Sequence, residues 1–421
     1  MALAWLTFLT FSVSLSVQQS LYGNSPEVLE LWPHNFDTYV QSNFSKSTVV
    51  QFYFSWCGSC QNYASKWIQF TRDVTAYKWN SVIQPAVFNC EPPNARQVCS
   101  KYNVKRTPFI KYFPFNPNFA QPPRGFEGRS RDSRQKLLNF AASSVASDLS
   151  KPSYLPRFNP LGRFGPEIFW NPDFNPKERR LVTATDLSST LKYMLLHEIA
   201  LSNDIAGTEF LSLKNFIAAL KAYYPGRSTE IVLINYVDAW LASRNSTTGS
   251  QFRQAVQYFD NRLGKPLSGK IDWIACNGSK PYYRGYPCGL WTLFHTLTVK
   301  DYVKNGKTIR GYIRDFFSCS ECADHFEKGA KRMSETVRKP EDSVLWLWRT
   351  HNIDNYFLKG HLTEDPEHPK TQFPPRKICP KCMTGDHIFT KADVFNFTNN
   401  SKWNDKEVLQ FLLRVYGTVQ F

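Results

Sequence analysis

The chain has 421 residues, of which 42% are hydrophobic and 15% aromatic, a composition that supports real hydrophobic cores and excludes a disordered chain. At about 150 residues per domain, this length predicts two or three domains. The 51 Lys and Arg outnumber the 35 Asp and Glu, but the basic runs are short and far apart. They favour a cationic, solvated surface over a nucleic-acid site, with loose attraction to acidic surfaces or glycans as the alternative.

Residues 2–17, ALAWLTFLTFSVSLSV, form an uncharged apolar stretch. Its length suits the core of a secretory signal peptide and is too short to span a bilayer, although the usual basic residues before it are missing. We therefore expect a signal peptide over residues 1–18, with a buried first strand or helix as the alternative. No later stretch is long and apolar enough to cross a membrane.

Cysteine usage and glycosylation sequons agree with export. Ten cysteines, an even number, follow this signal-like start and favour disulfides over metal ligands. Five N-x-[ST] sequons occur, at Asn43, Asn245, Asn277, Asn396 and Asn399. We expect a secretory-pathway protein, either secreted or kept in the Golgi lumen.

The region over residues 22–148 alternates strand-like and helical stretches. TVVQFYF at 48–54 and PFIKYF at 108–113 are β-branched and aromatic runs typical of strands, and amphipathic stretches such as residues 64–74 lie between them. Residues 149–180 are an expected linker, because six prolines exclude regular helix there: Pro152, Pro156, Pro160, Pro166, Pro172 and Pro176.

The remainder of the chain is predicted to be helical. Apolar residues recur at helical spacing from 182 to about 263, with Asp186 as an expected capping residue, and again from 272 to the end, interrupted by a Pro-rich stretch at 366–380. The fold class that follows is multidomain, with an N-terminal α/β domain followed by an all-α region.

The segment VVQFYFSWCGSCQNYASKW predicts a strand, a tight turn and a helix that begins near Cys57. Free N–H groups and the dipole at a helix start stabilise a thiolate, and Cys60, one turn later, can close a disulfide. An inert disulfide is the alternative. About 50 residues on, Pro108 in RTPF suits a cis-peptide turn packed against the dithiol. Cys90 and Cys99 are expected to form a structural clip.

The pattern of strand, WCxxC, helix and later TP resembles the thioredoxin fold of the protein disulfide isomerase branch. Ser59 stands where isomerases have His, which removes one stabiliser of the thiolate and predicts a less oxidising pair.

Three predicted helices of the C-terminal region each carry aromatic, imidazole or amide groups on one face. The residues are Trp291 with His295, Cys322 with His325, and Trp348, His351, Asn352 and Asn355 at i, i+3, i+4 and i+7. Core helices carry Leu or Val on such stripes. A flat, heteroaromatic, hydrogen-bonding ligand would explain all three stripes together.

Zinc is the competing explanation for the pairs Cys319/Cys322 and Cys379/Cys382. However, 57 positions separate the two pairs, whereas zinc modules have about 15 to 20. We therefore expect no metal.

The segments RGYPCGLWTLFH, FFSCSECADHF, VLWLWRTHNIDN, DPEHPKTQFPP and CPKC together resemble the flavin-dependent sulfhydryl oxidase domain of the Erv/ALR kind. Behind a thioredoxin-like domain, the whole mature chain resembles the quiescin sulfhydryl oxidase family, in a form without the second thioredoxin domain. The resemblance implies a thioredoxin domain over 22–148, a helical spacer with a degenerate Erv-like fold over 181–268, and an FAD-binding four-helix bundle over 270–421.

The resemblance also implies roles for individual residues. FAD contacts fall on Arg284, Trp291, His295, Glu321, His325, Trp348, His351, Asn352, Asn355, Lys370 and Phe373, where Phe373 stands in place of a frequent Trp. Cys276/Cys288 and Cys379/Cys382 match further disulfides of the family. The first is read as a structural staple, and the role of the second stays open.

The implied activity is that of a flavin-dependent thiol oxidase that introduces disulfides into reduced proteins. Substrate reduces the first pair at Cys57, the expected more exposed sulfur. The pair then reduces Cys319–Cys322, and Cys322 passes electrons to FAD and dioxygen, giving hydrogen peroxide. The alternatives are a flavin-free disulfide isomerase whose helical half only binds clients, and a structural zinc or extracellular interaction protein.

Overall fold

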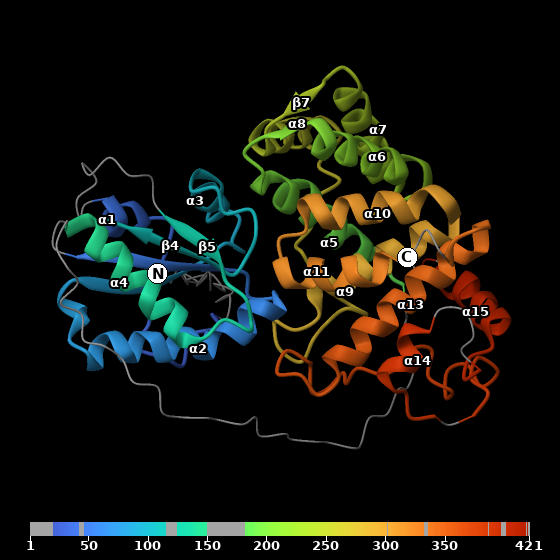
Figure 1. Ribbon diagram of the computed structural model, residues 1–421. Helices are drawn as coiled ribbons and strands as arrows, with labels where there is room; N and C mark the ends of the chain where they lie inside the picture. The colour runs from blue at the N-terminus through green and yellow to red at the C-terminus, as the bar shows by residue number, and fades with distance from the viewer. Residues whose placement is uncertain are drawn as a thin grey trace, which may run out of the picture.

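A computed structural model of the chain describes residues 20–41, 46–114, 124–149, 182–300, 302–331, 336–385, 387–396, 401–417 and 419. The expected signal peptide and nearly all of the expected linker lie outside these ranges, as do the sequons at Asn43 and Asn399. An α/β domain lies on one side and a helical body on the other, and the two meet along one face of each (Figure 1).

The α/β domain is built on a five-stranded sheet of order β1-β3-β2-β4-β5. The strands are β1 (Leu29–Leu31), β2 (Ser47–Tyr53), β3 (Ile83–Asn89), β4 (Phe109–Phe113) and β5 (Gly125–Glu127). The first three are parallel, and β4 and β5 join antiparallel. Every residue of β2 is buried, which explains why β-branched and aromatic side chains dominate it, although Ser47 and Gln51 are buried there too.

Helices flank this sheet and fix the ends of its strands. They are α1 (Phe36–Gln41), α2 (Gly58–Ala76), α3 (Arg96–Lys101) and α4 (Arg134–Leu149), with a short 3₁₀ turn at Trp79–Ser81. Helix α2 begins directly after β2, as the sequence predicts, and packs on α4. The peptide bond between Thr107 and Pro108 is cis and leads into β4.

The segment after residue 181 forms a helical spacer. It contains α5 (Ala184–Tyr193), a π-helical turn (Met194–Glu198), a 3₁₀ turn (Ile199–Leu201), α6 (Gly207–Tyr223), α7 (Ser228–Ala242) and α8 (Gly249–Arg262), with a short strand pair β6 (Ile205–Ala206) and β7 (Ser246–Thr247). The cap of α5 differs from the prediction, because Thr183 is the capping residue. The Asp186 carboxylate instead accepts from the backbone N–H groups of Ile274 and Ala275 and so ties the spacer to the next domain.

The C-terminal domain packs four helices against one another: α9 (Gly285–Lys300), α10 (Tyr302–Phe316), α11 (Ser320–Ala330) and α13 (Pro340–Leu358). Helices α14 (Lys391–Phe395) and α15 (Asp405–Gly417) close its far side. Helix α6 lies along α10 and α5 along α9, so spacer and bundle share one core. In the described part of the chain, no helix combines the length and apolar character needed to cross a bilayer.

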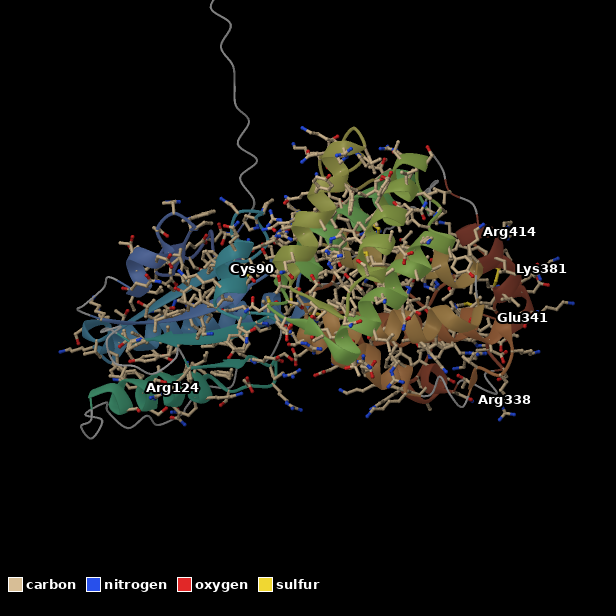
Figure 2. The ribbon with its side chains drawn as sticks, turned by 90° about the horizontal axis from the view of Figure 1, so that it is seen from above. Cys90, Arg124, Arg338, Glu341, Lys381 and Arg414 are labelled. Carbon is tan, nitrogen blue, oxygen red and sulfur yellow. A yellow bond between two sulfur atoms is a disulfide. The ribbon has the colours of Figure 1, made fainter. Side chains whose placement is uncertain are left out.

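The α/β domain and the helical body meet beside Cys57, which follows β2, and Thr107, which precedes β4. Viewed from above, Cys90 lies on the side of the α/β domain that faces the helices, whereas Arg338, Glu341, Lys381 and Arg414 lie at the opposite end of the molecule (Figure 2). The loop that carries Cys90 is closed by a disulfide to Cys99, as expected.

Candidate functional site: two cysteine pairs and an aromatic cavity

The first cysteine pair lies at the start of α2. Cys57 is the N-cap residue, and the Cys60 N–H donates to the Cys57 carbonyl at 2.9 Å. Both residues are free thiols. Both are also fully buried, which corrects the expectation of a more exposed Cys57, because the helical body covers the end of α2.

The two thiols differ in acidity. Burial alone would raise the pKa of Cys57, but hydrogen bonds from the Cys60 thiol and the Ser59 hydroxyl outweigh burial and lower it below its usual value. Burial and the neighbouring Cys57 raise the pKa of Cys60. Cys57 is therefore the more readily ionised thiol of the pair.

The second pair, Cys319 and Cys322, is a disulfide at the start of α11. The segment before this helix forms a parallel β-bridge with Thr107, the residue before the cis-proline. The Thr107 N–H donates to the Ser318 carbonyl at 2.8 Å, and the Ser320 N–H donates to the Thr107 carbonyl at 3.3 Å. Main-chain pairing therefore brings the two cysteine pairs together.

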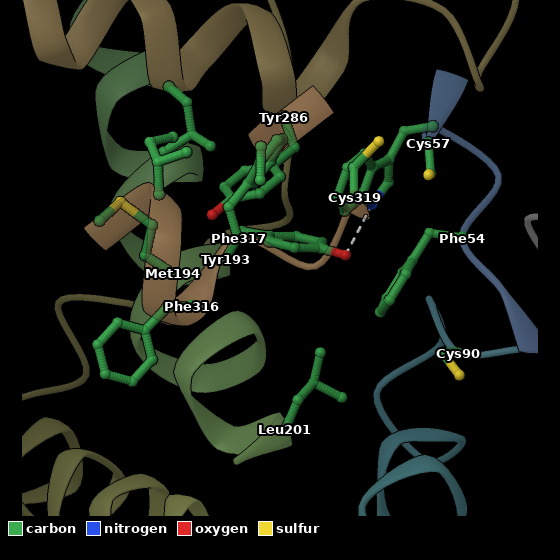
Figure 3. Close-up of a cluster of buried hydrophobic side chains, with 14 of the residues drawn as sticks. Phe54, Cys57, Cys90, Tyr193, Met194, Leu201, Tyr286, Phe316, Phe317 and Cys319 are labelled. Carbon is green, nitrogen blue, oxygen red and sulfur yellow. Dashed lines mark hydrogen bonds between the residues drawn. The ribbon is translucent and has the colours of Figure 1, made fainter. Parts of the chain in front are cut away.

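Ser59 lies between the pairs. Its hydroxyl is 3.2 Å from Cys57 Sγ and 3.5 Å from Cys319 Sγ. Figure 3 shows Cys57 and Cys319 beside each other, with Tyr193, Tyr286 and Phe317 packed around them. A free dithiol thus faces an intact disulfide, with Cys57, Cys60 and Cys319 buried, an arrangement suited to thiol–disulfide exchange.

Polar contacts around the sulfurs hold the α/β domain on the helical body. The Glu321 carboxylate accepts from the N–H and the hydroxyl of Ser130, at 3.0 and 2.8 Å. Asp324 pairs with Arg129 one turn further along α11. The Trp56 indole N–H donates to the Tyr193 hydroxyl at 2.8 Å.

A cavity opens on the other side of the second disulfide, between α9, α11 and α13. It encloses about 780 Å³, part of it open to solvent, and Cys322 forms part of its wall. Trp291 and His351 stack there with ring centroids 4.0 Å apart and planes 4° apart. His295 Nε2 lies 3.1 Å from His351 Nδ1, and burial lowers the pKa of His295 to about 3, so this imidazole is neutral.

The polar groups of the cavity fit FAD, the cofactor implied by the resemblance. Trp291 and the stacked His351 give a flat wall for an aromatic ring system. Next to His351 and outside the lining itself, His295 has a buried Nδ1 with no hydrogen-bond partner among the described residues. Lys370 is a buried amine whose pKa is lowered first by burial and then by the nearby Arg284, and two adjacent cations suit the diphosphate of the cofactor.

The predicted FAD residues divide into two groups. Those that line the cavity are Trp291, His325, His351, Asn355 and Lys370. Those outside its lining are Arg284, His295, Glu321, Trp348, Asn352 and Phe373. His295 orients His351, and Glu321 faces the α/β domain. Trp348 and Asn352 both donate to the Phe373 carbonyl and so fix the loop after α13.

Several residues of the lining are absent from the sequence prediction. Apolar members such as Leu290, Phe294 and Phe317 carry no signal that separates them from ordinary core residues. Asp354 also lines the cavity, and its place next to the His351 and Asn355 positions could have revealed it. Burial raises the pKa of Asp354 to about 7, and the Lys370 charge opposes this rise.

The two other predicted disulfide pairs are bonded. Cys276–Cys288 joins the segment before α9 to its first turn. Cys379–Cys382 lies in the stretch between α13 and α14, where the Cys382 carbonyl accepts from the Asn404 N–H.

Three family models match separate parts of the chain. The thioredoxin model matches residues 27–139, the model of flavin adenine dinucleotide (FAD)-dependent sulfhydryl oxidase matches residues 178–279, and the Erv1/Alr family model matches residues 288–374. The three matches follow the order of the α/β domain, the spacer and the four-helix bundle.

Human proteins are similar over most of the chain. Sulfhydryl oxidase 2 of Homo sapiens is 27% identical over 89% of this chain and 70% of its own length. Sulfhydryl oxidase 1 of Homo sapiens is 28% identical over 79% of this chain and 60% of its own length. The chain thus spans between 60% and 70% of the length of these two relatives.

Among solved structures, the chain resembles a sulfhydryl oxidase fragment of human QSOX1. The two are 35% identical with a TM-score of 0.51, and the match covers 58% of this chain and 99% of that fragment.

Proposed function

This chain belongs to the quiescin sulfhydryl oxidase family of FAD-dependent thiol oxidases, and on that premise we propose that its two cysteine pairs relay electrons from reduced proteins to the cavity. The observation that carries the proposal is the contact of Ser59 with both Cys57 and Cys319. In the proposed relay, the free pair is the donor and the disulfide is the acceptor.

The transfer between the pairs is two thiol–disulfide exchanges. The Cys57 thiolate attacks Cys319 Sγ, a Cys57–Cys319 bond forms, and the bond to Cys322 breaks with its electron pair on Cys322. The Cys60 thiolate then attacks Cys57 Sγ, so that Cys57–Cys60 becomes a disulfide and Cys319 leaves as a thiolate. The lowered pKa of Cys57 and the Ser59 hydroxyl support this direction of attack.

Reduced Cys322 faces the cavity, where Lys370 and Arg284 would hold the anionic part of FAD and Trp291 and His351 its ring system. When bound, FAD supplies the two-electron acceptor and the dioxygen chemistry that yields hydrogen peroxide. The lowered pKa values of His295 and His351 keep these two imidazoles neutral, and the docked α/β domain helps to bury Cys57, Cys60 and Cys319.

The first step regenerates the free dithiol. A client thiolate attacks Cys57 of the oxidised first pair, and a second client thiol resolves the mixed disulfide and leaves with an oxidised product. Because both sulfurs are buried in the docked arrangement, the α/β domain must separate from α11 to receive a client. The signal-like start and the disulfides support a role in the secretory pathway, either secreted or in the Golgi lumen.

The test combines a spectrum with two cysteine variants. The purified protein is expected to show flavin absorption and to form one hydrogen peroxide for each disulfide made in a reduced protein. Cys322→Ser should abolish oxygen uptake with every substrate. Cys57→Ser should abolish turnover of the reduced protein and leave turnover of a small dithiol, which reduces Cys319–Cys322 directly.

Three results would contradict the proposal. A colourless protein would remove FAD as acceptor. Oxygen uptake by Cys322→Ser would break the order of transfer. Unchanged turnover of the reduced protein by Cys57→Ser would exclude the relay.

A further inference from the structure

A glutamate of the spacer is buried beside the two cysteine pairs. Glu198 ends the π-helical turn and is 1% exposed. Its Oε1 accepts from the Ser318 N–H at 2.7 Å, and its Oε2 has no hydrogen-bond partner in the described part of the chain. Ser318 directly precedes Cys319 and carries the carbonyl that pairs with Thr107. The carboxyl therefore holds the strand that presents Cys319.

The same turn of the spacer also reaches the first cysteine pair. Tyr193, five residues before Glu198, accepts a hydrogen bond from Trp56, the residue before Cys57. Residues five apart diverge on an α-helix, but the wider π turn brings them onto one face. The segment 193–198 thus contacts Trp56, which precedes Cys57, and Ser318, which precedes Cys319.

Charged and titratable groups surround Glu198 from every side of this junction. They are Cys57, Glu91 and Arg96 of the α/β domain, Tyr193 and His197 of the spacer, and Tyr286 and Tyr312 of the bundle. Arg96 stacks over the Tyr193 ring at 4.8 Å. Burial raises the pKa of Glu198 to about 8, and the Ser318 hydrogen bond and Arg96 only partly oppose this rise.

We propose that Glu198 is a positioning residue for the transfer between the cysteine pairs, and that the spacer is a working part of the transfer site. Glu198 acts by fixing Ser318 so that Cys319 pairs with Thr107 within reach of Cys57. A neutral carboxyl can do this without placing a negative charge beside the attacking thiolate, since Oε2 has room to carry the proton. The inference rests on the relay proposed above and adds a residue to it.

The test measures how strongly the two sulfurs are held together, without FAD turnover. In the full chain with Cys60→Ser and Cys322→Ser, Cys57 and Cys319 are the remaining thiols of the two pairs. Equilibration with a glutathione buffer gives the effective concentration of one thiol at the other. Glu198→Ala should lower this value about tenfold, because it leaves a buried N–H without an acceptor. Glu198→Gln keeps an acceptor and carries no charge, so its effective concentration should equal or exceed that of the parent.

A buried glutamate elsewhere in the spacer provides the matched control. Glu230 on α7 is fully buried and accepts from the Arg227 N–H, but it contacts neither cysteine pair. Glu230→Ala should leave the effective concentration unchanged. An equal loss in Glu230→Ala would assign the effect to general loosening of the spacer and overturn the positioning role.

The pH dependence of the effective concentration distinguishes a positioning role of the Glu198 carboxyl from a purely structural role. Burial raises the pKa of Glu198 to about 8, and docking of the α/β domain contributes part of that burial. Docking is therefore more favoured while the proton is bound, and it loses this advantage as the pH rises toward about 8. The effective concentration of the parent should therefore fall relative to that of Glu198→Gln across this window. An unchanged ratio, or a Glu198→Ala value equal to the parent, would overturn the proposal. A parent that forms no Cys57–Cys319 disulfide would instead overturn the relay itself.

Discussion

Thr107 and Cys319 are paired as neighbouring strands across the boundary between the α/β domain and the helical body. The hydrogen bonds of this pairing are main-chain bonds, the kind by which an extended peptide adds to the free edge of a sheet. Such bonds do not depend on side-chain identity. The α/β domain therefore holds the Cys319 segment by its backbone, and we expect an extended client to bind at Thr107 in the same way.

The first prediction concerns the hydroxyl between the sulfurs. Ser59→Ala should raise the pKa of Cys57 by up to about one unit and slow transfer to Cys319 about 3- to 10-fold, because one hydrogen bond to the thiolate is lost. The pH dependence of Cys57 alkylation and stopped-flow reduction of the flavin measure the two effects.

Ser55→Ala is the matched control for Ser59. Ser55 is equally buried, but its hydroxyl accepts from Asn89 and not from a sulfur. Identical alkylation profiles for Ser59→Ala and Ser55→Ala would rule out a role of the Ser59 hydroxyl.

The second prediction assigns Glu321 to docking. Glu321→Ala removes two hydrogen bonds to Ser130, so oxidation of a reduced protein should fall about tenfold while flavin content and oxidation of a small dithiol stay near the parent values. Glu327→Ala, on the same helix, breaks the contact with Arg310 inside the bundle and should spare the protein substrate. Loss of flavin in Glu321→Ala would instead show that Glu321 contributes to cofactor binding and would contradict its assignment to docking.

The third prediction concerns the carboxyl in the cavity. The pKa of Asp354 is raised from 3.8 to about 7, so its contribution to folding falls as the pH rises between those values. In FAD-free protein, Asp354→Asn should gain about 1 kcal/mol over the parent at about pH 8, after allowance for solvent in the cavity, and almost nothing at about pH 4. Thermal unfolding at both pH values measures the difference. An equal gain at both would exclude titration of Asp354 as its cause.

The fourth prediction separates the last disulfide from the relay. Cys379–Cys382 closes a short loop. The Cys382 carbonyl accepts a hydrogen bond from the Asn404 N–H, next to the β-bridge between Met383 and Trp403. Replacing both cysteines with Ser should cost about 2 kcal/mol of unfolding free energy and leave the rates with proteins and small dithiols unchanged. Selective loss of the rate with reduced protein would instead give this pair a redox role.

The sequence predicts those parts of the fold that depend on local pattern. The buried run at 48–54 appears as β2, one residue earlier, because β-branched and aromatic residues favour a strand that is buried on both faces. The polar stripe with Trp291 and His351 appears as the cavity wall, because His and Asn are unusual on core helix faces.

Contacts between domains could not be predicted from local sequence patterns. Ser59 contacts Cys319, which is 260 positions away in the sequence, and Glu321 contacts Ser130, which is 191 positions away. Glu198 follows the apolar stretch MLLH and looks like the exposed end of a core helix. Its burial depends on how three parts of the chain pack, which helical periodicity does not encode.

The backbone of Thr107, just before β4, pairs with one segment at a time, and this has a kinetic consequence. On the proposed relay, we expect a client and the Cys319 segment to compete for the same Thr107 backbone groups, so that the oxidised product leaves before Cys57 reduces Cys319–Cys322. The protein thiol and oxygen then react in separate steps and need not be bound at the same time. Plots of reciprocal rate against reciprocal protein-thiol concentration, measured at several oxygen levels, are therefore expected to be parallel.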